Sequence, residues 1–224
     1  MHNRLCLIFA GIGLLLCIGC NSDTPPTEGP APSGRAPDVT AEAKTQQPPP
    51  APKTKAEQLA VAAMEQVGQT TKYDPAYVKL AYPGGDVPIE RGVCTDVIVR
   101  ALRKLDVDMQ VLIHEDMKAS FKSYPDLWGL SRPDPNIDHR RVPNIAAFLR
   151  RKGKTVPVTS NARDYLPGDI VVWKLPGGRQ HTGIVSNARA RGTDRCKIVH
   201  NIGAGTQLED VLFAFEITDH FRYF

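Results

Sequence analysis

The chain has 224 residues, with 28 Lys and Arg against 24 Asp and Glu, and a formal net charge of +4 at pH 7. This excess is too mild for a nucleic-acid binder, which is expected to carry a basic face with base-stacking aromatic side chains. No phosphate-binding glycine loop is present, because Gly203-Ala204-Gly205 follows a predicted strand without a helix after it. We therefore expect neither nucleic acid nor a nucleotide as a partner.

Residues 1–20 have the layout of an export signal. One cation, Arg4, precedes an apolar run over residues 5–19, which is shorter than the ~20 residues that a membrane-spanning helix needs. The tetrapeptide Cys17-Ile18-Gly19-Cys20 resembles a bacterial lipobox, in which the last cysteine is acylated and becomes the mature N-terminus. Cys17 stands where leucine is usual, so a plain secreted chain or an uncleaved anchor is the alternative to lipidation at Cys20.

Residues 21–55 are rich in proline, including Pro48-Pro49-Pro50, and Val39 is their one large apolar side chain. Such a segment cannot bury enough surface to fold, so we interpret it as a disordered tether. Asn21, directly after Cys20, favours the outer membrane over the inner one. We expect a lipoprotein of the bacterial cell envelope, anchored in the outer membrane and facing the periplasm, or otherwise a periplasmic or secreted protein.

Residues 56–224, about 170 in number, have the size of one domain with its own core. Apolar residues at helical spacing predict helices over residues 56–66 and 95–105. Cys94 falls at or near the N-terminus of the second helix. There the unpaired N–H groups and the helix dipole favour an anion, so we expect the Cys94 thiol to be shifted toward thiolate.

The rest of the domain changes character along the chain. Residues 114–144 are rich in Pro and Asp and predict an ordered insertion, with residues 116–124 helical and a turn at 133–136. Another short helix is expected over residues 145–151. Short runs of Val and Ile between turn residues then predict strands. The predicted strands are residues 169–173, 182–186, 196–200 and 211–217. Helices followed by strands indicate an α+β domain.

Several motifs resemble those of a known superfamily. Tyr82, Gly84-Gly85 and Cys94, then residues 167–171 and 181–185, follow the order seen in NlpC-type papain-like cysteine peptidases, which typically cut peptides of the bacterial cell wall. Motifs at residues 73–77, 114–117, 134–141 and 200–205 are similar to those of the YijF-like family of exported bacterial domains. The resemblance covers essentially all of residues 56–224. It implies a papain-like fold in which N-terminal helices that carry the nucleophile pack on a C-terminal antiparallel β-sheet.

The resemblance also implies roles for individual residues. Cys94 is similar to the nucleophile, His181 to the general base, and His200 to the polar third group that orients the imidazole. Tyr82 is similar to the tyrosine that lines the nucleophile and supports the oxyanion, together with the backbone N–H of Cys94. Asp96 is a candidate for substrate contact, and Asn201 or Asp169 is an alternative orienting group. The sequence Val93-Cys94-Thr95-Asp96 departs from the usual Asp-Cys-Ser-Gly. The insertion also lengthens the interval between Cys94 and His181. Both departures bear on the identity of the substrate.

Each of these residues also has a purely structural interpretation. Cys94 can be a small buried residue, His181 or His200 a satisfied structural histidine, Asp169 a turn residue at a strand entrance, and Asp96 a first-turn carboxylate that complements the helix dipole. The histidines and acidic residues have no tight zinc spacing, so we expect no metal and no cofactor. Cys94 and Cys196 offer one disulfide in an oxidising compartment, although the surroundings of both argue against it.

The sequence therefore predicts an exported thiol-dependent hydrolase, a cysteine peptidase or amidase, that cleaves an amide bond in the bacterial envelope. Peptidoglycan stem peptide is the leading substrate class. One alternative is a thiol acyltransferase or amidase that acts on another envelope molecule. The other is a non-catalytic module of the same fold that binds wall peptide or a partner protein.

Overall fold

The computed structural model of the protein describes residues 54–224. The predicted signal, the candidate lipidation site Cys20 and residues 21–53 of the predicted tether lie outside the described residues. The described part contains the helices α1 (Lys55–Met64), α2 (Cys94–Arg103), α3 (Met109–Ser120) and α4 (Val142–Arg151). Single turns of 3-10 helix lie at Phe121–Ser123, Asp138–Arg140 and Ala162–Asp164.

Six strands form an antiparallel sheet in the order β3-β8-β4-β5-β6-β7. They are β3 (Thr155–Val156), β4 (Ile170–Lys174), β5 (Gln180–Arg189), β6 (Cys196–Asn201), β7 (Thr206–Glu209) and β8 (Glu216–Phe221). A separate parallel ladder joins β1 (Lys72–Tyr73) to β2 (Arg91–Gly92). The structure thus confirms the predicted α+β arrangement, in which the helix that begins at Cys94 packs on a C-terminal antiparallel sheet.

The central strands bury both of their faces. Ile170, Val172, Ile184 and Val199 join the larger core beneath the helices, while their neighbours in sequence join a smaller cluster on the other face. This alternation follows from the two-residue period of a strand. The smaller cluster consists of Tyr165, Val171, Trp173, Val185, Cys196, Ile198 and Leu212. Burial on both faces explains why these strands are continuous runs of Val and Ile in the sequence.

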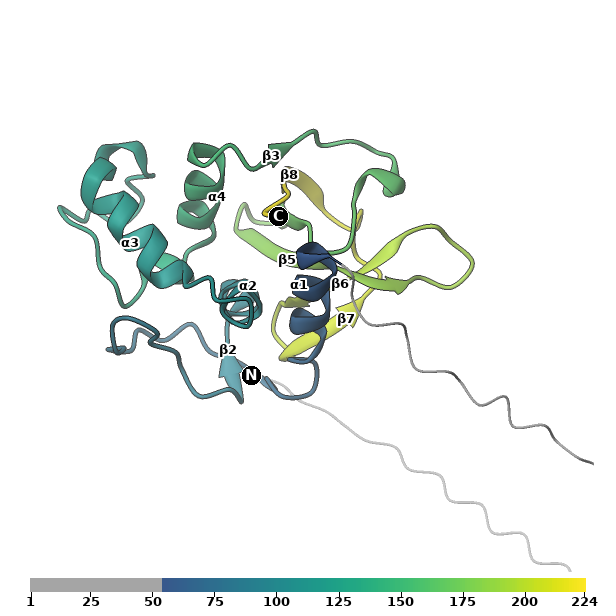
Figure 1. Ribbon diagram of the computed structural model, residues 1–224, viewed down its shortest axis with the longest axis horizontal. Helices are drawn as coiled ribbons and strands as arrows, with labels where there is room; N and C mark the ends of the chain where they lie inside the picture. Colours follow the sequence, from purple (N-terminus) through teal and green to yellow (C-terminus); the bar gives the residue numbers. More distant parts are fainter. Residues whose placement is uncertain (1–53) are drawn as a thin grey trace, which may run out of the picture. The chain divides into compact units, whose positions relative to one another are not determined.

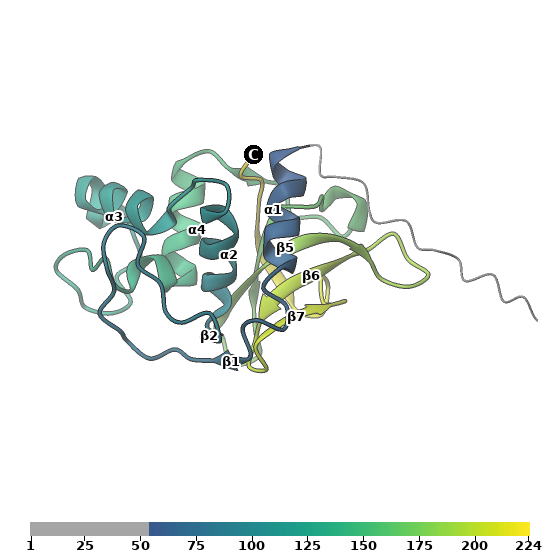
Figure 2. The same ribbon diagram turned by 60° about the horizontal axis from the view of Figure 1, so that its bottom comes forward.

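Helices α1 and α2 both pack on β5. Both ribbon views place α2 between α1 on one side and α3 and α4 on the other (Figures 1 and 2). Every residue from Cys94 to Leu102 of α2 is buried as a result. The N-terminus of α2 is therefore held by its surroundings on several sides, which is a requirement for a precisely placed side chain at that end.

The helix termini have local causes in the sequence. Thr54 and Glu57 form a capping box at α1, in which Thr54 Oγ1 accepts from the Glu57 N–H and Glu57 accepts from the Thr54 N–H. At α2, the carboxylate of Asp96 accepts a hydrogen bond of 2.7 Å from the N–H of Val93. This bond fixes the turn that leads into Cys94.

Two predicted elements differ from the structure. Helix α3 begins at Met109 instead of residue 116, because the Asp108 carboxylate caps it by accepting from the Gln110 N–H. The prediction of a strand over residues 211–217 is wrong, since only its last two residues belong to a strand, β8. Leu212 is apolar for another reason: it is fully buried in the smaller cluster, and its carbonyl accepts from the indole N–H of Trp173.

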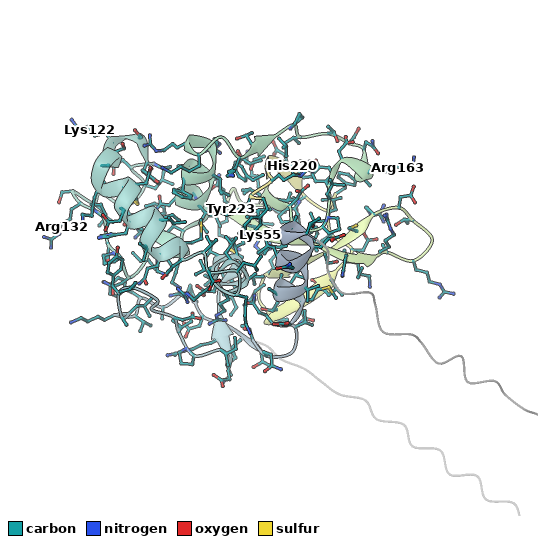
Figure 3. The ribbon with its side chains drawn as sticks, in the orientation of Figure 1. Lys55, Lys122, Arg132, Arg163, His220 and Tyr223 are labelled. Carbon is teal, nitrogen blue, oxygen red and sulfur yellow. The ribbon has the colours of Figure 1, made fainter. Side chains whose placement is uncertain are left out.

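Among residues 54–224, no helix has the length and apolar character needed to cross a bilayer. Figure 3 shows Lys122 and Arg132 at the end of the domain near α3, and Arg163 at the opposite end. His220 lies between them and is 1% exposed.

Candidate functional site

A short parallel ladder brings a tyrosine to the entrance of α2. Tyr73 of β1 pairs with Gly92 of β2, two residues before Cys94. Tyr73 and Cys94 line the same cavity, which has a volume of about 940 Å³. Burial raises the pKa of the Tyr73 hydroxyl, and the negative charge of a Cys94 thiolate raises it further. Tyr73 thus lies beside Cys94, in the place predicted for Tyr82.

Tyr82, the tyrosine predicted to line the nucleophile, is elsewhere. It is 42% exposed, its hydroxyl donates to Glu115 over 3.0 Å, and its ring packs edge-on against His114. It does not line the cavity that contains Cys94. The prediction followed the position of Tyr82 before Gly84-Gly85, whereas the pairing of β1 with β2, which is invisible in the local pattern, selects Tyr73.

The Cys94 side chain is 5% exposed, and its thiol is within reach of three backbone N–H groups, those of Thr182, Thr95 and Cys94 itself. Burial nevertheless raises the pKa of the Cys94 thiol to about 12, and the charge of Asp96 adds to that rise. The expected shift toward thiolate is therefore wrong for the unliganded protein. The N–H groups do act in the predicted direction, but desolvation of the sulfur outweighs them.

His181 and His200 come together on neighbouring strands. Nε2 of His181 lies 2.8 Å from Nδ1 of His200, and Nε2 of His200 lies 2.9 Å from the carboxylate of Glu209 on β7. Burial lowers the pKa of His181 to about 3, and the charge of His200 lowers it further. Burial also lowers the pKa of His200, although Glu209 opposes this effect. Both imidazoles are therefore neutral at physiological pH.

Gly183 permits this approach of the strands. It pairs with His200 across β5 and β6, and a Cβ atom there would lie 2.7 Å from a methyl group of Ile198 and 3.0 Å from the Cβ of His200. Contacts this short do not occur without displacement. The glycine in the motif His181-Thr182-Gly183 thus has a steric role beside the histidine pair.

Strand β5 carries His181 and also contacts the thiol of Cys94. The N–H that lowers the pKa of Cys94 most belongs to Thr182, the residue directly after His181. Within residues 54–224, no hydrogen bond joins Cys94 to His181, and His181 is 3% exposed. Apo sites commonly hold such pairs at longer range and tighten when substrate binds.

Asp96 does not contact the cavity. Its carboxylate accepts from Nε and Nη2 of Arg140, each over 2.9 Å, and the two side chains are only 4% and 2% exposed. Arg140 also donates to the carbonyls of Asp74 and Ala76 in the segment after β1. The acid proposed as a substrate contact therefore positions the arginine and, through it, the chain segment that follows Tyr73.

Asn201 and Asp169, the alternative orienting groups, are committed to other contacts. The Asn201 amide donates to the carbonyl of Gly92 over 3.0 Å, which ties β6 to β2. The Asp169 carboxylate accepts from the N–H of Leu166, from His220 and from the guanidinium of Arg222. Its position in the turn before β4 agrees with the structural interpretation of Asp169. Of the three candidate orienting groups, His200 is therefore the one that hydrogen-bonds the ring of His181.

The cavity around Cys94 combines aromatic, apolar and cationic walls. The guanidinium of Arg141 stacks on the ring of Trp128, with 3.9 Å between Cζ and the ring centroid, and its Nη1 donates to Asp138. Arg179 comes from the turn that leads into β5, and Gln180 is the first residue of that strand. The cavity is also lined by Tyr73, Tyr77, Leu127 and Ile137. These walls fit a ligand with both apolar and anionic parts.

Among the described residues, no three His, Cys, Asp or Glu side chains are arranged to hold a metal ion. Cys94 and Cys196 are both free thiols, and Cys196 is buried in the smaller cluster at the start of β6. Sequence reasoning missed Glu209, Arg140 and Tyr73. Glu209 lies between the predicted strands at residues 196–200 and 211–217 and has no motif around it, so no local signal marks it.

Comparison with known proteins agrees with the resemblance noted in the sequence. The chain is 56% identical over 167 residues to the protein "Uncharacterized protein YijF" of Escherichia coli K12, a match that covers 74% of this chain and 80% of that protein. A solved structure with some likeness is NlpC1 from Trichomonas vaginalis, at 14% identity and a TM-score of 0.40, over 77% of this chain and 45% of that chain. The family model described as a domain of unknown function, DUF1287, matches residues 60–223. The chain therefore belongs to the DUF1287 family, together with YijF.

Proposed function

We propose that the protein is a thiol-dependent hydrolase that cleaves an amide bond in the bacterial envelope, with peptidoglycan stem peptide as the leading substrate class. The observation that carries this proposal is the position of Cys94. Its thiol borders a cavity, lies against backbone N–H groups at the start of α2, and adjoins the strand that carries His181, which is in turn paired with His200. Nucleophile, base and orienting group are the parts that covalent catalysis by cysteine requires.

In the proposed reaction, His181 takes the proton of the Cys94 thiol while the sulfur attacks the substrate carbonyl carbon. Nε2 of His181 is engaged with His200, so Nδ1 is the nitrogen available to take that proton. The carbonyl oxygen becomes an oxyanion, for which the Cys94 N–H and the Tyr73 hydroxyl are the candidate donors. The leaving amine then takes the proton from His181, and water hydrolyses the thioester.

The pKa values constrain the first step. A thiol with a pKa of about 12 and an imidazole with a pKa of about 3 are each costly to charge alone in the buried site. Proton transfer and attack on the carbonyl must therefore be coupled, so that the thiolate and the imidazolium arise together. Substrate binding is the event that brings sulfur, base and carbonyl into that arrangement.

The cavity walls support a peptide substrate over a lipid. Arg141 and Arg179 add positive charge near Cys94, and arginine is well suited to bind a carboxylate. Tyr77 and Trp128 supply flat apolar surface beside them. Stem peptides carry several free carboxylates, whereas an acyl chain has no use for the cations. The assignment to the envelope rests on the predicted export signal and lipobox at Cys20.

The test is incubation of the purified protein with isolated stem peptides and with whole peptidoglycan fragments, followed by mass spectrometry of the products. We expect cleavage by the wild type and by the matched control Cys196→Ala, and none by Cys94→Ala or His181→Ala. Cleavage that survives Cys94→Ala would rule out the thiol mechanism. Saturable binding of wall peptide without any cleavage would move the non-catalytic module to first place.

A further inference from the structure

We propose that Glu209 is a positioning residue, whose carboxylate sets the tautomers of His200 and His181 so that Nδ1 of His181 is left unprotonated. The functional meaning of that nitrogen rests on the function proposed above. The arrangement of protons on the two rings, however, is a property of the resting protein and can be measured without any substrate.

The contacts form an unbranched chain across three adjacent strands. Nε2 of His181 on β5 meets Nδ1 of His200 on β6 at 2.8 Å, and Nε2 of His200 meets Oε2 of Glu209 on β7 at 2.9 Å. His181 and His200 are 3% and 1% exposed. The Glu209 side chain is 47% exposed, so the far end of the chain reaches solvent. The order of β5, β6 and β7 in the sheet is what brings the three groups into line.

The carboxylate decides which ring nitrogens carry protons. An ionised carboxylate only accepts hydrogen bonds, so Nε2 of His200 must be protonated. A neutral His200 then has its lone pair on Nδ1, and Nε2 of His181 must donate to it. A neutral His181 consequently has its free lone pair on Nδ1, in the state required of a general base. The low pKa values of both histidines support the neutral form of each ring.

The opposite arrangement shows what Glu209 prevents. If Nδ1 of His200 donated to Nε2 of His181, then Nδ1 of His181 would carry the proton and have no lone pair to offer. Nε2 of His200 would also turn a lone pair toward the Glu209 carboxylate, which is repulsive. Without the carboxylate, no charged acceptor fixes the direction of the hydrogen bond between the two rings. One charged acceptor at the end of the chain removes this ambiguity.

Glu209 has no other described ion-pair partner. Among the ion pairs of residues 54–224, it takes part only in the one with His200. Its neighbour Asp210 binds Arg195 instead, and so belongs to a different contact. Among the described ion pairs, the Glu209 carboxylate is therefore committed to His200 alone.

The first experiment measures tautomers by long-range proton–nitrogen NMR in the full chain, labelled at its six histidines. His181→Ala and His200→Ala assign the signals. We expect protons on Nε2 of both rings in the wild type and in the control Glu216→Gln, which changes an exposed acid of β8 outside this contact. The amide of Glu209→Gln can both donate and accept, so in this variant we expect a large population protonated at Nδ1 of both rings. We expect Glu209→Asp, which keeps a carboxylate, to restore part of the wild-type pattern.

The second experiment measures the rate at which iodoacetamide modifies Cys94 at pH 8, followed by mass spectrometry of its peptide. Loss of a charge-assisted hydrogen bond shifts an equilibrium on the order of tenfold to a hundredfold, and we expect Glu209→Gln to slow the reaction by up to that factor. Thermal unfolding checks that the variant is folded.

Unchanged tautomers in Glu209→Gln would overturn the proposal, and so would a tautomer shift that leaves Cys94 reactivity equal to that of Glu216→Gln. The proposed function fails differently, by peptide cleavage that persists in Cys94→Ala. Both the tautomer shift and the slower reaction are required to support the role of Glu209.

Discussion

Replacing Arg140 by methionine tests the buried ion pair behind Cys94. The Arg140 and Asp96 side chains are 2% and 4% exposed and share two hydrogen bonds of 2.9 Å. The variant Arg140→Met keeps much of the side-chain volume but leaves the Asp96 carboxylate buried, with the Val93 N–H as its remaining described donor. Removing one partner of a buried pair costs about 3–5 kcal/mol, because the other charge stays out of water. We expect a loss of that size in the free energy of unfolding.

The assay is urea unfolding of the full chain, followed by tryptophan fluorescence and far-UV circular dichroism. With a denaturant slope of about 2 kcal/mol/M, the midpoint should fall by about 1.5–2.5 M. The matched control is Arg163→Met. It breaks an ion pair to Asp194 whose side chains are 75% and 58% exposed, and such pairs contribute about 0–1 kcal/mol.

Asp96→Asn combined with Arg140→Met should recover part of the loss, since the double variant leaves no uncompensated charge. The reasoning would be refuted by an Arg140→Met variant that unfolds at the same urea concentration as Arg163→Met. That result would mean that water reaches the Asp96 carboxylate once the arginine is gone.

Three further predictions concern an acid, a thiol and a glycine. Burial acts to raise the pKa of Asp116, but hydrogen bonds from Arg151, Lys152 and Tyr124 outweigh it and hold the pKa well below its usual range. A lowered folded-state pKa stabilises the protein above the unfolded-state pKa of about 3.9 and ceases to do so as the pH falls toward the folded-state value. Asp116→Asn should therefore cost about 2 kcal/mol at pH 7 and progressively less below pH 4, as measured by urea unfolding; a cost that grows in acid would contradict this sign. With a pKa of about 12, the Cys94 thiol should react with iodoacetamide at pH 8 about 10³-fold more slowly than a free thiol. The rate should rise as the pH is raised to 11. A rate that reaches a plateau below pH 9 would show that the sulfur is better solvated than its burial implies. Gly183→Ala should separate β5 from β6 and abolish the hydrogen bond between His181 and His200, which the same histidine NMR spectra report; an unchanged spectrum would show that Ile198 yields without cost.

The sequence predicted the elements whose causes are local. Helix α2 has an uninterrupted apolar face, and strands β4, β5 and β6 are short runs of Val and Ile bounded by turn residues, so their periods identify them. Cys94, His181 and His200 lie on these elements. The order of the motifs indicated the fold, and the fold brings His181 to His200 and Thr182 to Cys94.

The remaining parts of the site depend on contacts between distant segments. Arg140 reaches Asp96 across 44 residues of sequence, and the ladder that places Tyr73 beside Cys94 is only two residues long. Tyr73 and Arg140 lie in the motifs at residues 73–77 and 134–141, but a motif does not show which distant segment its side chains contact. Glu209 is on β7, a strand of four residues that was not predicted at all. The direction in which the pKa of the Cys94 thiol is shifted was also predicted wrongly, because the depth at which a residue is buried depends on tertiary structure.

The protonated state of Cys94 has a consequence for the lifetime of the protein. Peroxide and disulfides react with the thiolate, so a thiol kept protonated and 5% exposed is a poor target for oxidation to sulfenic acid or for mixed-disulfide formation. Cys196, the other free thiol of the described residues, is also buried and also has a raised pKa. Burial and a raised pKa thus protect both described thiols from the reactions that a thiolate undergoes.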